Sequence, residues 1–341
     1  MQAKFTYLNY YITKTKTKMR DTLKLILLTL ILSISISGYS QSKDEAGVAY
    51  NDGIQFVKAD DYNGAIEAFE KAISICNEVG AEADEIKSMA SQQLPAQYYK
   101  SAMAIYKEKK LDESIKRFEK TAEIAKKYND AGIEKKANKM IPQLYNVKGG
   151  TYLKKKDYDN ALKNFDIAIE KDPEFAKAYY SKGLVYNKLK DPVKMKEAFD
   201  LSIQKAEAKG NSKTSSRSKN TARKYLTTFA VKSIQKEKID DALNFLDQAT
   251  EYGEGNANTY YYYAISYNKK KKWAEAIKAG NKALELEKDE KAANAKIYFE
   301  LGTAYYGNGD STSACNAYKE AAYGDHVEQA NYQIKEVLKC Q

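Results

Sequence analysis

The chain has 341 residues, of which 43% are hydrophobic and 30% are charged, and it contains only one histidine. A single histidine excludes a multi-histidine metal site, and the sequence has no Cys-x-x-Cys pair, phosphate-binding Gly-rich loop or Gly-x-Ser-x-Gly elbow. Carboxylates are numerous, but they follow charged helix faces and no pair is marked as a general acid and base. We therefore predict that the protein is not an enzyme and needs no metal or cofactor.

The first forty residues have the pattern of an export signal. An apolar run of 15 residues, from Leu23 to Ser37, follows a basic segment and precedes small residues, as in secretory signal peptides. The run is shorter than the roughly 20 residues that a membrane-spanning helix needs. We expect residues 19–40 to be a signal peptide that is cleaved near Ser40, with an uncleaved anchor as the alternative.

Two consequences follow from such a signal. Met19 is a more usual signal start than Met1, so residues 1–18 are a candidate over-called start. Export would place the mature chain in the periplasm or elsewhere in the cell envelope, with no transmembrane span after cleavage. Removing residues 1–40 lowers the excess of Lys and Arg over Asp and Glu from ten to five. So mild an excess, in an exported protein, argues against nucleic acid as a partner.

After residue 45, one motif recurs seven times. A small residue is followed by a bulky residue three positions later and an Ala-type residue nine positions after that, usually with an aromatic and a further small residue beyond. Two clear copies start at Gly149 and Gly183, 34 residues apart, which is the period of stacked helix pairs. The seven small-residue anchors are Gly53, Ala102, Gly149, Gly183, Ala230, Ala264 and Gly302. Within each copy, offsets of three, four and seven residues place the motif side chains of a helix on one face, where a large side chain fills the gap left by a small one.

These residues resemble the tetratricopeptide repeat (TPR) family, whose helix pairs carry a Gly or Ala, a Tyr, an Ala, a Phe and an Ala in this order. Ser233 and Gly280 depart from it, standing where Tyr and Phe are usual, so their repeats are expected to be looser or repacked. The resemblance implies an all-α fold, a right-handed α-solenoid of about seven helix pairs over residues 41–341. The repeats are expected to start near residues 46, 95, 142, 176, 223, 257 and 295, and a capping helix should follow over residues 326–340.

The repeats are unevenly spaced, because three steps between anchors are longer than the others. The extra residues fall between one repeat's second helix and the next repeat's first helix, around residues 73–94, 122–141 and 203–222. We interpret the first two as lengthened helices, with Pro95 and Pro142 opening the next first helix. The third is rich in Ser and Lys, and we expect a mobile insertion over residues 207–222. It is either a solvated loop or a basic contact patch.

Three cysteines lie beyond the predicted signal. Cys315 belongs to the second helix of the last repeat, and Cys340 ends the helix that follows. Antiparallel packing of these helices would bring both sulfur atoms to the same level, so we predict a Cys315–Cys340 disulfide in an oxidising compartment. Cys76 is then expected to be a buried thiol.

The resemblance also locates a binding surface, because the first helix of each pair lines the concave face in TPR proteins. Tyrosine suits such a face because it offers a large amphipathic area. The residues predicted to line the groove are Tyr50, Tyr99, Tyr106, Tyr180, Asn187, Tyr261, Tyr262, Asn268, Phe299 and Tyr306. The family's clamp for the carboxylate of chaperone tails is not reproduced, since Asn146, Gly150 and Ser181 occupy positions where it would lie.

We therefore predict a non-enzymatic scaffold or adaptor of the cell envelope that holds a peptide segment or a partner domain on a Tyr-rich concave face. The sequence does not identify the protein partner or the oligomeric state. The alternative is a protein that binds cell-wall glycan or another saccharide, because exposed tyrosine rings stack on sugar faces.

Overall fold

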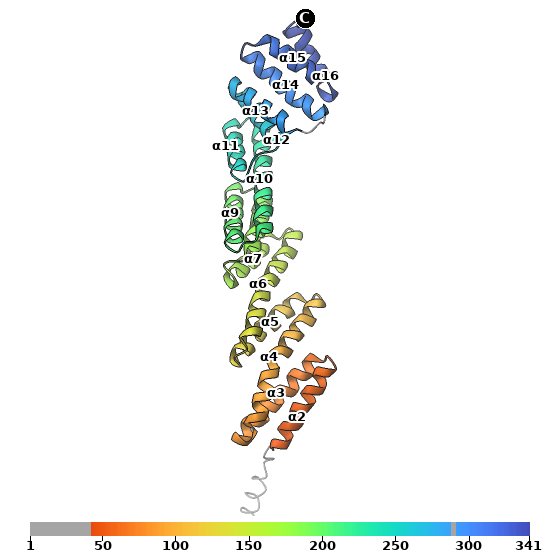
Figure 1. Ribbon diagram of the computed structural model, residues 1–341, viewed down its shortest axis with the longest axis vertical. Coiled ribbons are helices and arrows are strands. Elements are labelled where there is room, and N and C mark those ends of the chain that lie inside the picture. The colour runs from red at the N-terminus through yellow and green to blue at the C-terminus, as the bar shows by residue number, and fades with distance from the viewer. Residues whose placement is uncertain (1–41, 288–290) are drawn as a thin grey trace, which may run out of the picture. The chain divides into compact units, whose positions relative to one another are not determined.

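The computed structural model describes residues 42–287 and 291–341, and every regular element in these ranges is a helix (Figure 1). The helices form two compact units that divide between Asn138 and Lys139. The predicted signal peptide and the candidate over-called start lie outside the described residues. Within the described ranges, no helix is both long enough and apolar enough to cross a membrane.

The first unit is built from helices that pack on their neighbours in the chain. In it, α2 packs on α3, α3 on α4 and α4 on α5. Its helices are α2 (Lys43–Lys58), α3 (Tyr62–Val79), α4 (Asp84–Lys107) and α5 (Leu111–Lys127), and α6 (Ala131–Lys154) continues from it into the second unit. The chain enters α2 through a capping box, in which Ser42 and Glu45 each bond the other's backbone N–H.

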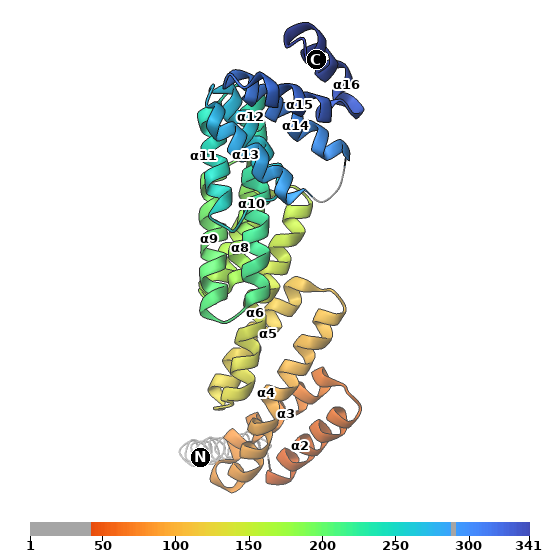
Figure 2. The same cartoon turned by 45° about the horizontal axis from the view of Figure 1, so that its top comes forward.

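The second unit continues the same pattern of antiparallel pairs (Figures 1 and 2). In it, α8 packs on α9, α10 on α11, α12 on α13 and α14 on α15. Its helices after α6 are α7 (Tyr158–Lys171), α8 (Ala176–Leu189), α9 (Pro192–Ala208), α10 (Ser212–Gln235), α11 (Ile239–Thr250), α12 (Ala257–Lys269), α13 (Trp273–Leu286), α14 (Lys291–Gly307), α15 (Ser311–Ala321) and α16 (Val327–Tyr332). The all-α solenoid class predicted from the sequence is confirmed.

The small residues of the motif allow the two helices of a pair to approach closely. A Cβ atom on Gly149 would lie 2.5 Å from the ring of Phe165, and one on Gly183 would lie 2.8 Å from the ring of Phe199. Both aromatic rings are fully buried. In the sixth repeat, Gly280 stands where the aromatic is usual. A Cβ atom on Gly280 would lie 2.7 Å from the side chain of Leu301 on the next helix. That repeat is repacked by a side chain from its neighbour.

The prediction of a mobile insertion over residues 207–222 is wrong. α9 continues to Ala208 and α10 begins at Ser212, with Asn211 as its N-cap. The Ser-rich composition is misleading because two of these serines, Ser215 and Ser218, are small buried residues of a packed interface. The Ser202 and Ser218 hydroxyls are buried and lie 2.9 Å apart. Each buried hydroxyl is therefore satisfied within the helix stack.

The predicted starts of three first helices are also wrong. Pro95 and Pro142 lie inside α4 and α6, and α10 begins well before residue 223. α4, α6 and α10 each have 24 residues, whereas α8 has 14. Most of the extra residues of the long steps therefore extend the first helices at their N-terminal ends, and the rest lengthen the preceding second helices. A proline was expected to mark a helix start, but these helices accommodate it within their length.

The C-terminal segment is tied to the last repeat by a disulfide. Cys315 on α15 and Cys340 are bonded, with their Cα atoms 5.8 Å apart, as the sequence predicted. Between them the capping segment is less regular than the predicted helix over 326–340. α16 ends at Tyr332, and a π-helical turn over Gln333–Val337 follows. Cys76 is a buried free thiol.

Candidate partner-binding face

The first helices of the second unit form one continuous surface. α8 contacts α10, α10 contacts α12, and α12 contacts α14. We call this surface, together with the C-terminal half of α6, the first-helix face. Two open grooves lie on it, one of about 660 Å³ between α6 and α8 and one of about 410 Å³ between α10 and α12.

The α6–α8 groove combines polar and apolar side chains with several lysines. Asn146 lies in it with its side-chain oxygen buried and without a hydrogen-bond donor among the described residues. Lys154, Lys156 and Lys188 provide cations on both sides, and none of the lining residues is an Asp or a Glu. A buried carbonyl oxygen without a donor favours a ligand that presents an N–H group.

The α10–α12 groove repeats this chemistry. Arg223 lines it and donates to the backbone carbonyl of Glu254 at 2.7 Å and to the side chain of Asn220 at 3.1 Å. Its charge is therefore positioned by neutral acceptors. The other lining residues are amides, hydroxyls, one lysine, one valine and one tyrosine: Asn220, Lys224, Thr227, Thr228, Val231, Asn256, Asn258, Thr259 and Tyr262. This groove also lacks a carboxylate.

Cations stack on two tyrosines beside the α10–α12 groove. The guanidinium of Arg217 on α10 lies 4.7 Å from the ring centroid of Tyr180 on α8, and its Nε–H donates to the Tyr180 hydroxyl at 3.1 Å. On α14, the ammonium of Lys296 lies 5.0 Å from the ring centroid of Tyr261 on α12. These contacts fix long cationic side chains on the first-helix face.

Most of the predicted groove residues serve packing instead of lining an open groove. In four repeats the first-helix aromatic lies against the second-helix aromatic. In the second unit, the ring centroids are 5.6 Å apart for Tyr180 and Phe199 and 5.5 Å apart for Phe299 and Tyr318. Tyr50 and Tyr99 make the same contact in the first unit. The predicted continuous tyrosine surface is therefore partly an internal layer between helices.

The remaining predicted residues fall in different environments. Tyr262 lines the α10–α12 groove, and Tyr306 is the most exposed of the predicted aromatics at 48%. Asn187 is half-buried, as is Tyr106 in the first unit. Asn268 is buried at the contact between α12 and α14. Within the second unit, the predicted residues therefore do not share one open site.

Asn268 is part of a buried polar pair. Its side-chain amide donates to the Glu300 carboxylate at 2.8 Å and to the Glu300 backbone carbonyl at 2.9 Å. Burial raises the pKa of Glu300, while the Asn268 bond and the charge of Lys269 lower it. The net shift is upward, which identifies a carboxylate held in a poorly solvated place.

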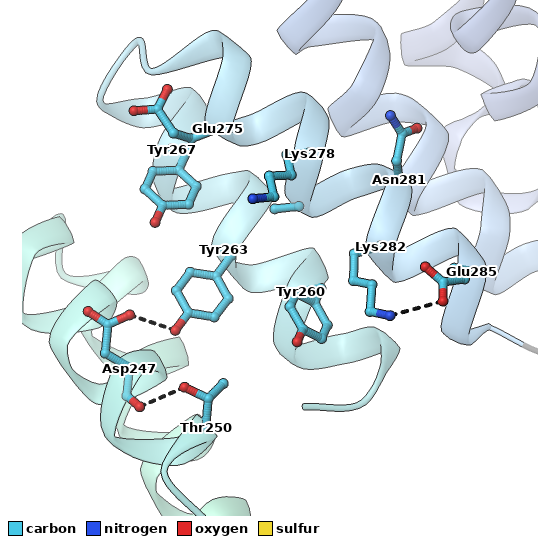
Figure 3. A pocket seen from close by; sticks show the side chains of 11 residues that line it. Asp247, Thr250, Tyr260, Tyr263, Tyr267, Glu275, Lys278, Asn281, Lys282 and Glu285 are labelled. Carbon is cyan, nitrogen blue, oxygen red and sulfur yellow. Dashed lines mark hydrogen bonds and ion pairs between the residues drawn. The ribbon is translucent and has the colours of Figure 1, made fainter. Parts of the chain in front are cut away.

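A third groove was missed from the sequence. It encloses about 810 Å³ between α11 and α13, and Figure 3 shows Tyr260, Tyr263 and Tyr267 of α12 along its floor. The Tyr263 hydroxyl donates to Asp247 at 2.7 Å, and its ring stacks on Tyr267 with centroids 5.9 Å apart. We call it the tyrosine groove. The spacing of three and four residues between these tyrosines was the signal that could have identified it.

The tyrosine groove differs from the first-helix grooves in its charge. Its walls carry Lys278 and Lys282 together with the carboxylates of Asp247, Glu275 and Glu285. Lys282 forms an ion pair with Glu285 at 2.9 Å, as Figure 3 shows. It forms a second ion pair, at 3.0 Å, with Glu254 in the α11–α12 loop. Much of its charge is therefore already balanced, whereas the first-helix grooves carry cations alone.

Comparison with known families gives the same repeat. Residues 149–190 match a TPR repeat model, and residues 234–293 and 295–323 match tetratricopeptide repeat models. This chain is a tetratricopeptide repeat protein. The matched segments contain α8, α12 and α13, which provide walls of all three grooves. TPR proteins are generally non-enzymatic, and the family supports an interaction scaffold.

One curated relative shares only part of its length with this TPR protein. The Hsp70-Hsp90 organizing protein of Triticum aestivum is 30% identical over 149 residues, which are 42% of this chain and 24% of that protein. The chain thus spans about a quarter of that relative.

Solved structures that match this chain do so with low sequence identity and low TM-scores. A crystal structure of the MamA protein is 19% identical, covering 57% of this chain and 95% of that one, with a TM-score of 0.37. A tetratricopeptide repeat protein from Parabacteroides merdae ATCC 43184 is 16% identical, covering 86% of this chain and 97% of that one, with a TM-score of 0.27.

Proposed function

We propose that this TPR protein is a non-enzymatic scaffold of the cell envelope that binds an extended segment of a partner protein along its first-helix face. The observation that carries the proposal is the repetition of one chemistry in two grooves. Both lie between consecutive first helices, and both offer amides, hydroxyls and cations without a carboxylate. A polypeptide backbone presents the complementary N–H and C=O groups to such side chains.

The cell-envelope location rests on the sequence. The apolar run from Leu23 to Ser37 has the length and flanks of a secretory signal. The Cys315–Cys340 bond is consistent with it, because disulfides persist in oxidising compartments. Fractionation of cells that express the whole chain tests this part of the proposal. Recovery in the cytoplasm with an intact N-terminus would contradict it.

Tryptophan substitutions that fill the two grooves test the binding surface. Gly150 lines the α6–α8 groove, and a Cβ atom there would meet no other atom within 4 Å. Thr228 is an exposed residue of the α10–α12 groove. We expect Gly150→Trp and Thr228→Trp to fill these grooves without disturbing the core, and to lower recovery of the partner from an envelope extract at least tenfold when combined.

The matched control is a tryptophan substitution in the tyrosine groove. Asn281→Trp adds the same side chain to the wall formed by α13, and recovery of the partner should equal that of the wild type. Circular dichroism and thermal unfolding must show that all variants fold. Loss of the partner in Asn281→Trp with full recovery in the double variant would place the binding surface on the other side of α12.

A further inference from the structure

α10 carries an unusually basic segment of the chain. Residues 208–236 contain eight Lys or Arg and no Asp or Glu. Small side chains such as Ser218 and Ala222 face the interior, whereas Lys213, Arg217 and Lys224 are exposed. The spacing of four and seven residues places these three cations on one side of the helix. We call them the basic stripe.

The charges of the basic stripe are not neutralised within the described chain. None of the three cations forms an ion pair with a carboxylate in residues 42–287 or 291–341. Arg217 is held by the ring and hydroxyl of Tyr180. Lys224 borders the carboxylate-free α10–α12 groove. An unpaired row of cations beside a groove favours an anionic ligand.

The start of the described chain has the opposite charge. Between Asp44 and Ile86 there are eleven Asp or Glu residues and two Lys. All eleven carboxylates are exposed, and within the described residues none pairs with a Lys or Arg. This excess of negative charge is concentrated in α2, α3 and the segment that follows them.

α2 presents part of this charge beside exposed apolar side chains. Its buried residues Ala46 and Ala49 face the core of the first unit. On its outer side, Asp44, Val48 and Asp52 are spaced by four residues and are all exposed, Val48 at 60%. We call these three residues the acidic stripe. An exposed valine between carboxylates has the composition of an interface with an apolar centre and a charged rim.

We propose that the acidic stripe of one molecule docks on the basic stripe of a second copy of this chain. Asp44 and Asp52 would face the cations of α10, and Val48 would enter the α10–α12 groove beside Val231 and Tyr262. Because each contact joins two different surfaces, both partners keep a free stripe. Association is therefore heterologous and produces open chains of molecules unless the geometry closes a ring.

This inference goes beyond the proposed function and affects it at one point. The second copy occupies the α10–α12 groove, so self-association competes with a partner segment there but leaves the α6–α8 groove open. The attraction is between exposed charges, and salt weakens it because the Debye length falls from about 10 Å at 0.1 M to about 3 Å at 1 M.

Sedimentation velocity of the purified chain at low and high salt provides the first test. At about 50 mM salt, where screening is weak, we expect the weight-average sedimentation coefficient to rise with protein concentration. At about 500 mM it should stay at the monomer value. A wild-type chain that remains monomeric at low salt across the concentration range would overturn the proposal.

Charge exchange provides the second test. One variant carries Lys213→Glu, Arg217→Glu and Lys224→Glu, and the other carries Asp44→Lys and Asp52→Lys. Each alone should sediment as a monomer, because both of its stripes then carry the same charge. An equimolar mixture should associate again, because the unchanged stripes of the two variants are complementary and so are the exchanged ones. Mixtures that stay monomeric while both variants fold would contradict the pairing.

A control variant separates this pairing from a change of net charge. It carries Lys116→Glu, Lys126→Glu and Lys163→Glu, which alter three exposed lysines of α5 and α7 by the same total charge. The control should associate as the wild type does. Loss of association in the control would show that net charge, instead of the stripes, governs association. Partner recovery through the α6–α8 groove is measured separately, so a failure of this proposal leaves the proposed function standing.

Discussion

Asn268 on α12 donates its side-chain amide to the carboxylate of Glu300 on α14 at 2.8 Å. A second bond at 2.9 Å, to the backbone carbonyl of the same glutamate, doubles the link. The pair therefore joins the first helices of two consecutive repeats, and it stabilises the stacking on which the first-helix face depends.

Removing the amide should leave a carboxylate without its donor. We expect Asn268→Ala to lower the free energy of unfolding by about 2 kcal/mol, since hydrogen bonds to charged groups are worth about 1.5–3 kcal/mol. Urea titration followed by circular dichroism measures the change. Asn187 occupies the equivalent position in another repeat and is half-buried, so Asn187→Ala is the control and should change little. Equal effects of the two substitutions would contradict a special role for the pair.

The pH dependence of stability should reveal the burial of Glu300. Its pKa is raised above the ordinary value of 4.5 by burial, so the folded protein binds this proton more tightly than the unfolded chain does. Its contribution is favourable at low pH and is lost as the pH rises from about 4.5 through the folded-state pKa. Glu300→Gln should therefore gain stability relative to the wild type as pH increases over this range. Parallel curves of melting temperature against pH for the wild type and Glu300→Gln would refute a stability contribution from the Glu300 proton.

Two adjacent glycines of α6 should respond to alanine in opposite directions. A Cβ atom on Gly149 would lie 2.5 Å from the Phe165 ring, so Gly149→Ala should cost about 1–3 kcal/mol by overpacking. At Gly150 nothing lies within 4 Å, and Gly150→Ala should add up to about 1 kcal/mol through helix propensity. Thermal unfolding of both variants decides this, and destabilisation of similar size at both positions would contradict the packing account.

The disulfide should protect the end of the chain locally. It closes a loop with a sequence separation of 25, so its loss should destabilise the capping segment by about 3 kcal/mol. In a repeat protein, this loss of stability should have little effect on distant repeats, because each repeat contacts only its neighbours. We expect Cys315→Ser with Cys340→Ser to speed amide hydrogen exchange in residues 324–341 and not in α8. Unchanged exchange at the terminus would show that packing alone holds this segment.

The sequence predicts the pairing of helices well because one physical relationship repeats. A small residue opposite a large ring, as in Gly183 and Phe199, recurs at the same spacing in the sequence of each copy. The sequence predicts helix starts less well. Taken alone, Pro95 is typical of a helix boundary and the serines of α10 are typical of a loop. Only their packing in the long first helices shows that they are interior positions.

The candidate site was harder to predict for a related reason. Tyr180 and Phe299 were assigned to a groove because they lie on first helices, but the same positions also face the second-helix aromatics. Helical spacing alone does not distinguish the two directions. The open grooves depend on where consecutive first helices separate, and residues such as Thr228 and Asn146 carried no signal of this in the sequence.

The central claim is that a partner segment lies on the first-helix face. Site-specific photo-crosslinking in intact cells tests it most directly, with the crosslinking residue placed at Thr228 in the α10–α12 groove or at Asn281 in the tyrosine groove. We predict an adduct with a partner protein from position 228 and none from position 281. An adduct from position 281 alone, or the absence of any adduct from position 228, would contradict the claim.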